Sequence, residues 1–481
     1  MLPAWSWSAA SLLLGSLHVR GADAIGPITP VGSKFFHEDG TQYYIKGVAY
    51  QLTPEDPLVN TDQCERDIAR MAELGTNAIR VYHVDPDADH DGCMNALADA
   101  GIYLFVDLET FDTAIRTDDP QWTRSQFDSY TAVLDEFQQY NNTAGVFIGN
   151  EVITAPDNSA AAPFVLAAAR DIKSYRNENH YRQIPVGYAA ADIAELRPML
   201  QNYMACRPDA ADRLDFFSLN AYEWCGDSSY EESGYRRLQH QAADFPIPIF
   251  FSETGCNVAR PRLFTDQSAI FSEPMSDTWS GSIIYEWIQE TNDYGLITYD
   301  DDDDTVTPDA GPNNNAPVAL DGFARQGAPN RVAPDFDNLK SQWATLNPTG
   351  VFLSDYIQST AAISPPECPA STPGGWAVDP NAPLPTLQDT FHTAAPTVPS
   401  ATRFPSITVS SGAGAGAGSS PTPTASFSPL SPSSFSATSF NYTLSNAGSA
   451  VAVPGQGFGL ARLADGFVVF GAVVGALAVW L

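Results

Sequence analysis

Short apolar runs, rich in β-branched and aromatic residues, alternate with segments of helical period between residues 25 and 364. Such runs are typical of β-strands, and a helical segment after each one is typical of βα units. Eight runs stand out: YYIKGVAY from Tyr43, NAIRVYHV from Asn77, IYLFVDLE from Ile102, GVFIGNE from Gly145, IPVGYAA from Ile184, DFFSLNAY from Asp215, PIPIFFSETG from Pro246 and SIIYEW from Ser282. This alternation predicts an α/β fold, a (β/α)8 TIM barrel over residues 25–370.

The segments between the runs carry helix signals. Asp62, with Glu65 three residues later, predicts a helix start of the capping-box kind, and Gly75 predicts the end of that helix. Between these signals the apolar residues fall on one helical face: Ile68, Met71 and Ala72. The same period recurs over residues 164–175, which predicts a second helix of this kind.

Two segments break the alternation. An acidic stretch that follows the eighth run, YDDDDDTVTPDAGPNNN from Tyr299, predicts a surface loop. Residues 371–445 are dominated by Ser, Thr, Pro, Ala and Gly, with too little apolar material to form a core. We interpret this second segment as a disordered, O-glycosylated stalk that spaces the barrel from a membrane or wall.

The two ends of the chain resemble processing signals. Residues 1–24 combine an apolar stretch with small residues near Ala24, which predicts a secretory signal peptide, although its start lacks Lys and Arg. Residues 446–481 finish in the apolar run GFVVFGAVVGALAVWL, which is too short for a comfortable membrane span. Because small residues precede it, we interpret it as a glycolipid (GPI) attachment signal with Asn446 as the anchored residue. A single-span or tail-anchored protein is the alternative.

The cysteines agree with export. The chain has 6 of them, an even number, which predicts three disulfides in an oxidising compartment. They form no close CxxC pair and no His lies at ligand spacing from them, so we predict neither a metal site nor a cofactor. Asn141 and Asn441 begin glycosylation sequons.

The charge of the chain limits its partners. Lys and Arg number 24 against 57 Asp and Glu, for a formal net charge of −33. Phosphate is repelled by such a chain, which argues against nucleic acid or an anionic surface as partner. A neutral substrate fits better, and solubility after export explains most of the acidity.

Two glutamates at strand ends carry the candidate chemistry. Glu151 ends the fourth run and Glu253 ends the seventh, so both face the mouth of the predicted barrel. A lone Glu at a strand end is usually a solvated loop residue, but a pair placed in this way meets the need of a retaining glycosidase. We expect burial and a neighbouring anion to raise the pKa of Glu151, so that Glu151 serves as the acid. Glu253 stays ionised and serves as the nucleophile. A mechanism that retains the configuration at the anomeric carbon requires the two carboxyl groups to lie about 5 Å apart.

The residues beside these glutamates have alternative interpretations. Asn150 is placed to bind a sugar 2-hydroxyl, and Tyr285 to donate a hydrogen bond that keeps Glu253 charged. Asp107 binds a sugar or orients a Tyr, and His83 fits a structural histidine better than a base. The strand-end aromatics are either barrel core or sugar-stacking platforms: Tyr82, Tyr222, Tyr285 and Trp287.

With these motifs in place, the chain resembles the fungal GPI-anchored β-1,3-glucanosyltransferases of glycoside hydrolase family 72. The matching segments cover residues 25–364: GSKFFHEDGTQYYIKGVAYQ, NAIRVYHVDPDADHDGCM, YLFVDL, GVFIGNE, FFSLNAYEWCG, FSETGCN and YEWIQETNDYGL. The resemblance implies that Glu151 is the acid/base and Glu253 the nucleophile. It also implies a set of substrate-binding residues: Gln51, Tyr82, Asp107, Asn150, Tyr222 and Tyr285.

The resemblance further implies the cysteine pairing, Cys64 with Cys93, Cys225 with Cys256 and Cys206 with Cys368. The chain departs from the family in two ways. The Asp-rich segment is longer than usual, and no cysteine follows Cys368, which indicates the subgroup without a cysteine-rich carbohydrate-binding module.

The resemblance therefore implies a monomeric, retaining β-1,3-glucanosyltransferase at the outer face of the plasma membrane and in the cell wall. Its partners are β-1,3-glucan donor and acceptor chains and, through the lipid anchor, the membrane. Two alternatives remain open, an endo-β-1,3-glucanase and a non-catalytic wall protein that binds glucan.

Overall fold

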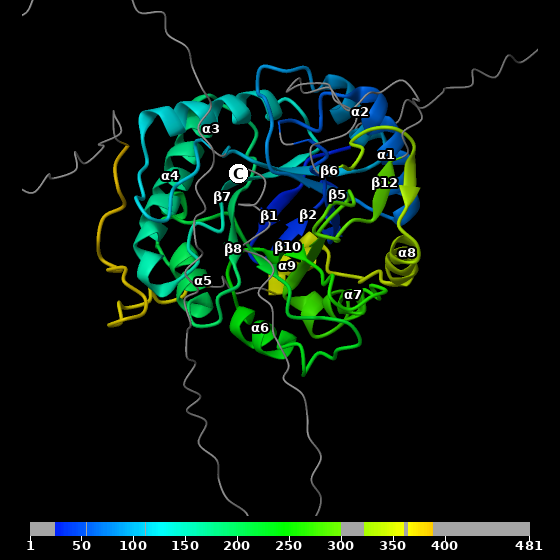
Figure 1. Cartoon of the computed structure of the whole chain (residues 1–481). Coiled ribbons are helices and arrows are strands. Elements are labelled where there is room, and N and C mark those ends of the chain that lie inside the picture. Colours follow the sequence, from blue (N-terminus) through cyan, green and yellow to red (C-terminus); the bar gives the residue numbers. More distant parts are fainter. Residues whose placement is uncertain (1–24, 54, 111, 300–321, 360–363, 388–481) are drawn as a thin grey trace, which may run out of the picture. The chain divides into compact units, whose positions relative to one another are not determined.

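A closed barrel of parallel strands forms the centre of the protein (Figure 1) in this computed structural model. The structure describes residues 25–53, 55–110, 112–299, 322–359 and 364–387. The strands follow one another around the barrel in chain order, and the last closes on the first. They are β4 (Ile45–Ala49), β5 (Ala78–Val81), β6 (Tyr103–Asp107), β7 (Thr143–Asn150), β8 (Val186–Ala191), β9 (Phe216–Ala221), β10 (Ile249–Thr254) and β11 (Trp279–Ile284). Each overlaps one of the eight predicted runs, although β7 and β11 begin before their runs and β8 ends one residue after its own, so the predicted TIM barrel is confirmed.

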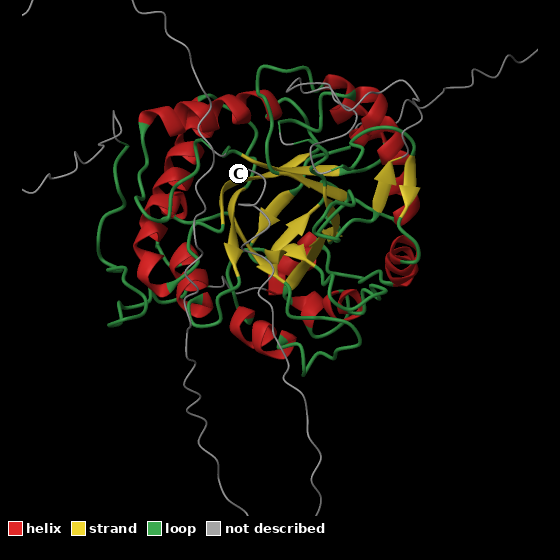
Figure 2. Cartoon of the chain, viewed as in Figure 1, coloured by secondary structure: helices red, strands yellow, loops and turns green. Residues whose placement is uncertain are grey.

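Helices surround the barrel strands (Figure 2). The α-helices are α1 (Thr61–Leu74), α2 (Asp91–Asp99), α3 (Arg124–Phe137), α4 (Ala162–Glu178), α5 (Arg197–Ala205), α6 (Tyr235–Ala242), α7 (Asp266–Ile270), α8 (Asp335–Thr345) and α9 (Leu353–Ser359). Three short 3-10 helices lie between them: η1 (Pro156–Ala161), η2 (Ala210–Asp212) and η3 (Met275–Asp277). Within the described ranges, no helix has the length and apolar character needed to cross a bilayer.

The cap of the first predicted helix lies two residues before its sequence signal. Asn60, not Asp62, caps α1, because the Asn60 side chain accepts a hydrogen bond from the backbone N–H of Gln63. Gly75 ends the helix in the left-handed conformation, as predicted. Ala72 is exposed rather than on the packed face, which is completed by Cys64 and Leu74.

Two small sheets complete the fold. A three-stranded sheet of β1 (Thr29–Val31), β2 (Lys34–Phe36) and β3 (Gln42–Tyr43) places Phe35 against Phe105, Phe216 and Phe250, at ring distances of 6.1–6.3 Å. This sheet therefore closes the amino end of the barrel. The second sheet pairs β12 (Ile297–Tyr299) with β13 (Pro329–Arg331), on either side of the Asp-rich segment.

Glycines make room for the aromatic rings inside the barrel. A Cβ at Gly187 would lie 2.1 Å from the Phe216 ring, and one at Gly145 would lie 2.9 Å from the same ring. The apolar runs GVFIGNE and IPVGYAA thus need glycine at these points, because a side chain would displace the Phe216 ring.

The segment after residue 370 packs on the barrel helices. Trp376 is fully buried and lies 5.4 Å from the Tyr203 ring, and the backbone N–H of Ala377 donates to Ser159 Oγ at 2.8 Å. Val378 and Leu384 are also buried. Residues 371–387 therefore belong to the packed unit, although composition assigns them to the stalk. A few apolar side chains that find a complementary surface are enough to dock a segment whose average composition is that of a linker.

The three disulfides are the pairs that the resemblance implies: Cys64 with Cys93, Cys206 with Cys368 and Cys225 with Cys256. The longest bridge, over 162 residues, fastens the C-terminal segment to α5. Asn141 of the first sequon is exposed between α3 and β7. The predicted signal peptide, Asn441, Asn446 and the rest of the predicted stalk lie outside the described residues.

Candidate active site

The carboxyl ends of the barrel strands bring the predicted site residues together. Asn150 is the last residue of β7 and Glu151 follows it, while Glu253 lies near the end of β10. The other predicted residues come from the ends of β4, β5, β6, β9 and β11: Gln51, Tyr82, Asp107, Tyr222 and Tyr285. Side chains from strands far apart in the sequence therefore line one face of the barrel, as the fold predicts.

Glu253 is held by three donors. The Tyr222 hydroxyl donates to its Oε2 at 2.6 Å, the Tyr82 hydroxyl donates to its Oε1 at 3.0 Å, and Arg80 Nη1 lies 3.3 Å from the same oxygen. Burial raises the pKa of Glu253 above its ordinary value, and the arginine and the two hydroxyls offset part of this effect. All three contacts are made to the charged form, as a nucleophilic carboxylate requires.

Glu151 has a different environment. Its Oε1 accepts one hydrogen bond, from Asn220 Nδ2 at 2.9 Å. Burial and the nearby Glu253 raise its pKa to about 7, against the weaker opposing effects of Asn220 and Arg80. A substantial share of Glu151 is thus still protonated near neutral pH, the property that a general acid needs.

Arg80, which sequence reasoning missed, connects these groups. It is fully buried and makes two hydrogen bonds to Asp107, at 3.0 and 2.8 Å, besides its contact with Glu253. Its Nη2 also donates to Asn150 Oδ1 at 3.0 Å. Its guanidinium stacks between the rings of Tyr82 and Phe147, at 4.3 and 4.5 Å from their centroids. The only signal in the sequence is a charged residue inside the otherwise apolar run NAIRVYHV.

Asp107 is the ion-pair partner of Arg80. The predicted alternatives were a contact with sugar or with a Tyr, but Asp107 is only 1% exposed and both of its oxygens accept from Arg80. Its place in the site is therefore behind Arg80, as the counter-charge that allows a cation to be buried there.

Asn220 is the second residue that sequence reasoning missed, and it links the two glutamates. Its Nδ2 donates to Glu151 Oε1 and, at 3.0 Å, to Asn150 Oδ1. Its Oδ1 accepts from Ser252 at 2.8 Å and lies 3.5 Å from Arg80 Nη1. Glu151, Asn220, Arg80 and Glu253 therefore form a continuous chain of polar contacts across the barrel mouth. Two donors occupy Asn150 Oδ1, which leaves its amide nitrogen to contact a substrate.

Tyr285 does not make the hydrogen bond predicted for it. Tyr222 and Tyr82 bind Glu253 instead, and the Tyr285 hydroxyl accepts from Gln51 Nε2 at 2.9 Å. The same Gln51 nitrogen donates to Glu286 Oε2 at 2.5 Å, and Asn292 Nδ2 donates to Glu286 Oε1 at 2.6 Å. Glu286 is a buried carboxyl that sequence reasoning missed, and it orients Gln51.

The strand-end aromatics separate into two groups. Tyr222, Tyr285 and the additional Tyr294 pack edge to face, at 5.3–6.3 Å, beside the nucleophile. Trp287, in contrast, is fully buried and donates from Nε1 to the Tyr299 hydroxyl at 2.9 Å. Trp287 is therefore core, and the tyrosines remain available to a ligand.

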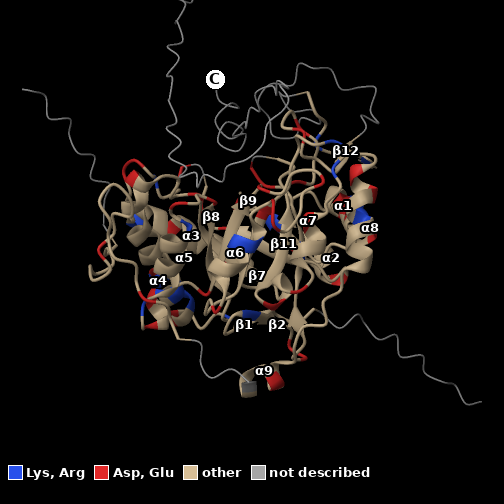
Figure 3. Ribbon diagram, turned by 90° about the horizontal axis from the view of Figure 1, so that it is seen from below, with Lys and Arg blue, Asp and Glu red and all other residues tan. Residues whose placement is uncertain are grey.

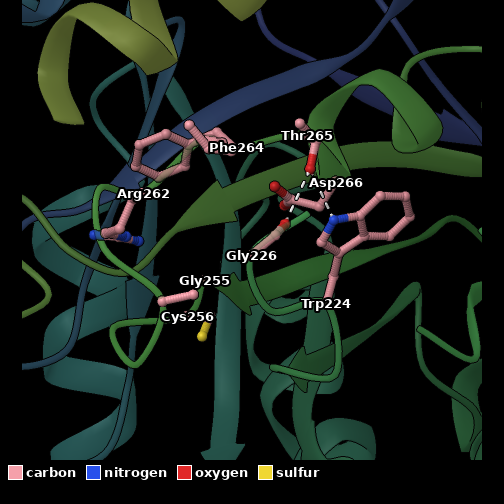
Figure 4. Close-up of a pocket in the computed structure, with 10 residues that line it drawn as sticks. Trp224, Gly226, Gly255, Cys256, Arg262, Phe264, Thr265 and Asp266 are labelled. Atoms are coloured by element: carbon pink, nitrogen blue, oxygen red, sulfur yellow. Dashed lines mark hydrogen bonds between the residues drawn. The ribbon is translucent and has the colours of Figure 1, made fainter. Parts of the chain in front are cut away.

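The turn after Glu253 packs against a small cavity of about 20 Å³, room for one water molecule (Figure 4). Neither Glu151 nor Glu253 lines this cavity. Arg262, which does, donates to the backbone carbonyl of Tyr285 at 2.8 Å and to that of Tyr294. A Cβ at Gly255 would lie 2.6 Å from Arg262 Nη2, so the glycine of the SETG motif lets this arginine approach and support the two tyrosines.

Acidic residues are spread along the ribbon of the described part of the protein, and basic residues are fewer (Figure 3). This distribution agrees with the net charge of −33. The site thus sits in an acidic protein, and Arg80, the cation between its carboxylates, is already committed to internal partners, an arrangement that suits an uncharged ligand.

Comparison with known proteins gives consistent results. A sequence profile of the glucanosyltransferase family, glycoside hydrolase family 72, matches residues 18–315, more than half of the chain. The 1,3-beta-glucanosyltransferase gas2 of Schizosaccharomyces pombe is 41% identical over 371 residues, which are 74% of this chain and 74% of that protein. The 1,3-beta-glucanosyltransferase PGA5 of Candida albicans is 39% identical over 72% of this chain, which spans only 53% of that longer relative.

Solved structures agree with these matches. A Saccharomyces cerevisiae Gas2p mutant in complex with laminaritetraose and laminaripentaose has 38% sequence identity and a TM-score of 0.66. The superposition covers 76% of this chain and 75% of that one.

Proposed function

This chain belongs to the glucanosyltransferase family, glycoside hydrolase family 72, and we propose that it cleaves a β-1,3-glucan and transfers the new reducing end to the non-reducing end of another glucan. The observation that carries this proposal is the pair Glu151 and Glu253. They share one polar network at the barrel mouth, yet Glu151 has a pKa raised to about 7 and accepts from one amide, whereas Arg80 and two hydroxyls donate to Glu253.

The first step breaks the glycosidic bond. The Glu253 carboxylate attacks the anomeric carbon while Glu151 gives its proton to the departing oxygen, so the leaving glucan departs as a neutral alcohol. The donor is then held as an ester on Glu253. Arg80 and the hydroxyls of Tyr222 and Tyr82 support the carboxylate before attack and again when it is released.

The second step forms the new bond. Glu151, now ionised, takes the proton of an acceptor hydroxyl as that oxygen attacks the anomeric carbon, and Glu253 leaves as a carboxylate. Two inversions retain the β configuration. Gln51, Asn150, Tyr222 and Tyr285 contact the sugars, whereas Asp107 acts through Arg80.

The cellular setting of the enzyme is also part of the proposal. The predicted signal peptide, stalk and GPI attachment at Asn446 support a location on the outer face of the plasma membrane and in the fungal cell wall, where the enzyme would lengthen and remodel glucan. It acts as a monomer, since one chain supplies the whole set of site residues described above.

The test is to incubate the purified protein with β-1,3-gluco-oligosaccharides of one defined length and to size the products. Products longer than the input support transfer. Products that are only shorter would identify an endo-β-1,3-glucanase, and binding without any change of length would identify a wall protein that only binds glucan. The same experiment is repeated with the Glu151→Gln variant, which we expect to lose transfer and cleavage together.

A further inference from the structure

Glu151 stands on an unusual turn. Its φ is +50°, in the left-handed region that non-glycine residues rarely adopt. Such a conformation costs roughly 1–2 kcal/mol, so the surrounding structure must hold it in place. Two of the bonds that do so lie after the turn. The Tyr188 hydroxyl accepts from the backbone N–H of Ile153 at 3.2 Å, and Thr117 Oγ1 donates to the Val152 carbonyl at 2.8 Å.

The bond before the turn comes from a side chain. The pairing of β6 with β7 ends at Asp107 and Phe147, whereas the pairing of β7 with β8 continues to Asn150. The backbone N–H of Glu151 donates to the Ala189 carbonyl of β8 at 2.8 Å, so that of Asn150 points to the other side, where β6 has already ended. There Glu109 Oε1 accepts it at 2.8 Å.

The Glu109 carboxyl is buried without a cation of its own. The residue is 8% exposed. The Nε, Nη1 and Nη2 atoms of the nearby Arg80 already contact other side chains, namely those of Asp107, Asn150, Asn220 and Glu253. Asp107 and the hydroxyl of Tyr130 also face the carboxyl, and the His83 ring interacts with its backbone carbonyl. Burial and Asp107 raise the pKa of Glu109 to about 8, so it is uncharged near neutral pH.

We propose that Glu109 is a positioning residue for the acid/base Glu151: by accepting the backbone N–H of Asn150, it holds the left-handed turn that aims the Glu151 carboxyl at the glycosidic oxygen. Glu109 touches neither the sugar nor the reacting atoms. It acts through geometry, and an uncharged carboxyl and a carboxamide supply the same accepting oxygen. This inference rests on the proposed role of Glu151.

Two variants separate geometry from charge. Glu109→Leu removes the accepting oxygen and substitutes an apolar side chain of similar size. Glu109→Gln, the matched control, keeps an accepting oxygen. We expect Leu to lower kcat on a β-1,3-gluco-oligosaccharide by about 30-fold, with KM changed by less than about 3-fold, because a misaligned acid loses part of the 10²–10⁴-fold that such catalysis contributes. We expect Gln to stay within about 3-fold of the wild type and to keep its pH profile.

A second substrate shows whether the loss passes through Glu151. A dinitrophenyl β-glycoside of the same oligosaccharide releases a phenolate that needs no proton, so its first turnover does not use the acid. We expect Glu109→Leu to slow dinitrophenol release by less than about 3-fold, although it slows cleavage of the natural bond by about 30-fold. A general loss of folded protein would slow both substrates equally.

Each outcome is decisive. Equal losses on the two substrates, or a Gln variant as impaired as Leu, would overturn the positioning role. So would a Leu variant as active as the wild type. If Leu does not fold, the Gln variant still decides, since a shifted alkaline limb would mean that a charge on Glu109 matters. A wild-type protein that transfers no glucan would instead refute the proposed function, and this result is distinguishable from a failure of the positioning role because it appears before any variant is made.

Discussion

The two ends of the barrel interior are built from the same strands in opposite ways. At the amino end, Phe35 packs against Phe105, Phe216 and Phe250, and the interior is aromatic and apolar. At the carboxyl end, strand β6 finishes at Asp107 and β9 carries Asn220, where the interior is a charged network around Arg80. We call these regions the aromatic floor and the polar mouth.

The contrast shows where stability and chemistry are supplied. Packed rings stabilise the floor through burial of apolar area. The mouth buries a cation and several carboxyls, which costs free energy unless each charge is paired. The floor thus offsets a mouth that is arranged for reaction rather than for stability. Changes at the mouth should cost activity, and changes at the floor should cost stability.

The largest expected effect is at the nucleophile. Glu253→Gln keeps the shape of the side chain but removes the attacking charge and turns one accepting oxygen into a donating nitrogen, so we expect kcat to fall by at least about 10⁴-fold. Removal of a buried carboxylate should leave the melting temperature unchanged or raise it. Kinetics and thermal unfolding on the same sample check both halves, and a large loss of stability would contradict the contrast.

Arg80 is the residue at which the two properties meet. Arg80→Met leaves Asp107 and Glu253 buried without their cation, so we expect about 3–5 kcal/mol less unfolding free energy and a loss of activity. The matched control is the double variant Arg80→Met with Asp107→Asn, which removes one of the two buried carboxylates left without a cation. It should recover part of the stability and none of the activity in denaturant unfolding and product assays. Recovery of activity would mean that Arg80 only balances charge.

The floor supplies the converse case. Phe216→Ala removes a ring at the centre of the aromatic floor, and we expect a loss of about 3–5 kcal/mol in unfolding free energy. At a temperature where the variant is still folded, kcat should remain within about 3-fold of the wild type. Phe216→Leu should lose less stability because it leaves a smaller cavity. A selective loss of kcat in the folded Ala variant would show that the floor takes part in the chemistry.

The smallest effect is a pH dependence. Cleavage requires protonated Glu151, whose pKa of about 7 lies above that of an ordinary glutamic acid. Activity should therefore be retained below pH 7 and fall about tenfold per unit above it. On the acid side, activity should fall where Glu253, whose pKa burial also raises, takes up a proton. A profile of kcat/KM that stays flat from pH 6 to 9 would contradict the assignment of the acid.

The fold followed from the sequence because its signals are local. Each apolar run marks one strand, and the two glutamates lie at the ends of the fourth and seventh runs, where a barrel gathers its functional groups. The pairing of Cys206 with Cys368 came from the family resemblance, since the spacing of the cysteines does not determine it.

The remaining features depend on contacts between distant strands. Arg80 is tolerated in a buried strand only because Asp107 and Glu253 reach it, and neither contact is visible in a run of apolar letters. Tyr222, and not the predicted Tyr285, donates to Glu253, because this contact depends on where each hydroxyl group lies in the folded barrel. Trp376 docks on Tyr203 from a segment of linker composition, which no local pattern predicts.

Covalent capture tests the central claim most directly, namely that Glu151 and Glu253 act on one sugar ring with Glu253 as nucleophile. A 2-deoxy-2-fluoro β-1,3-gluco-oligosyl fluoride forms the ester and breaks it down slowly, so peptide mass spectrometry can locate the label. We predict one glycosyl group per protein, on the peptide that contains Glu253. A label on any other side chain, or full turnover of the probe by Glu253→Gln, would contradict the account.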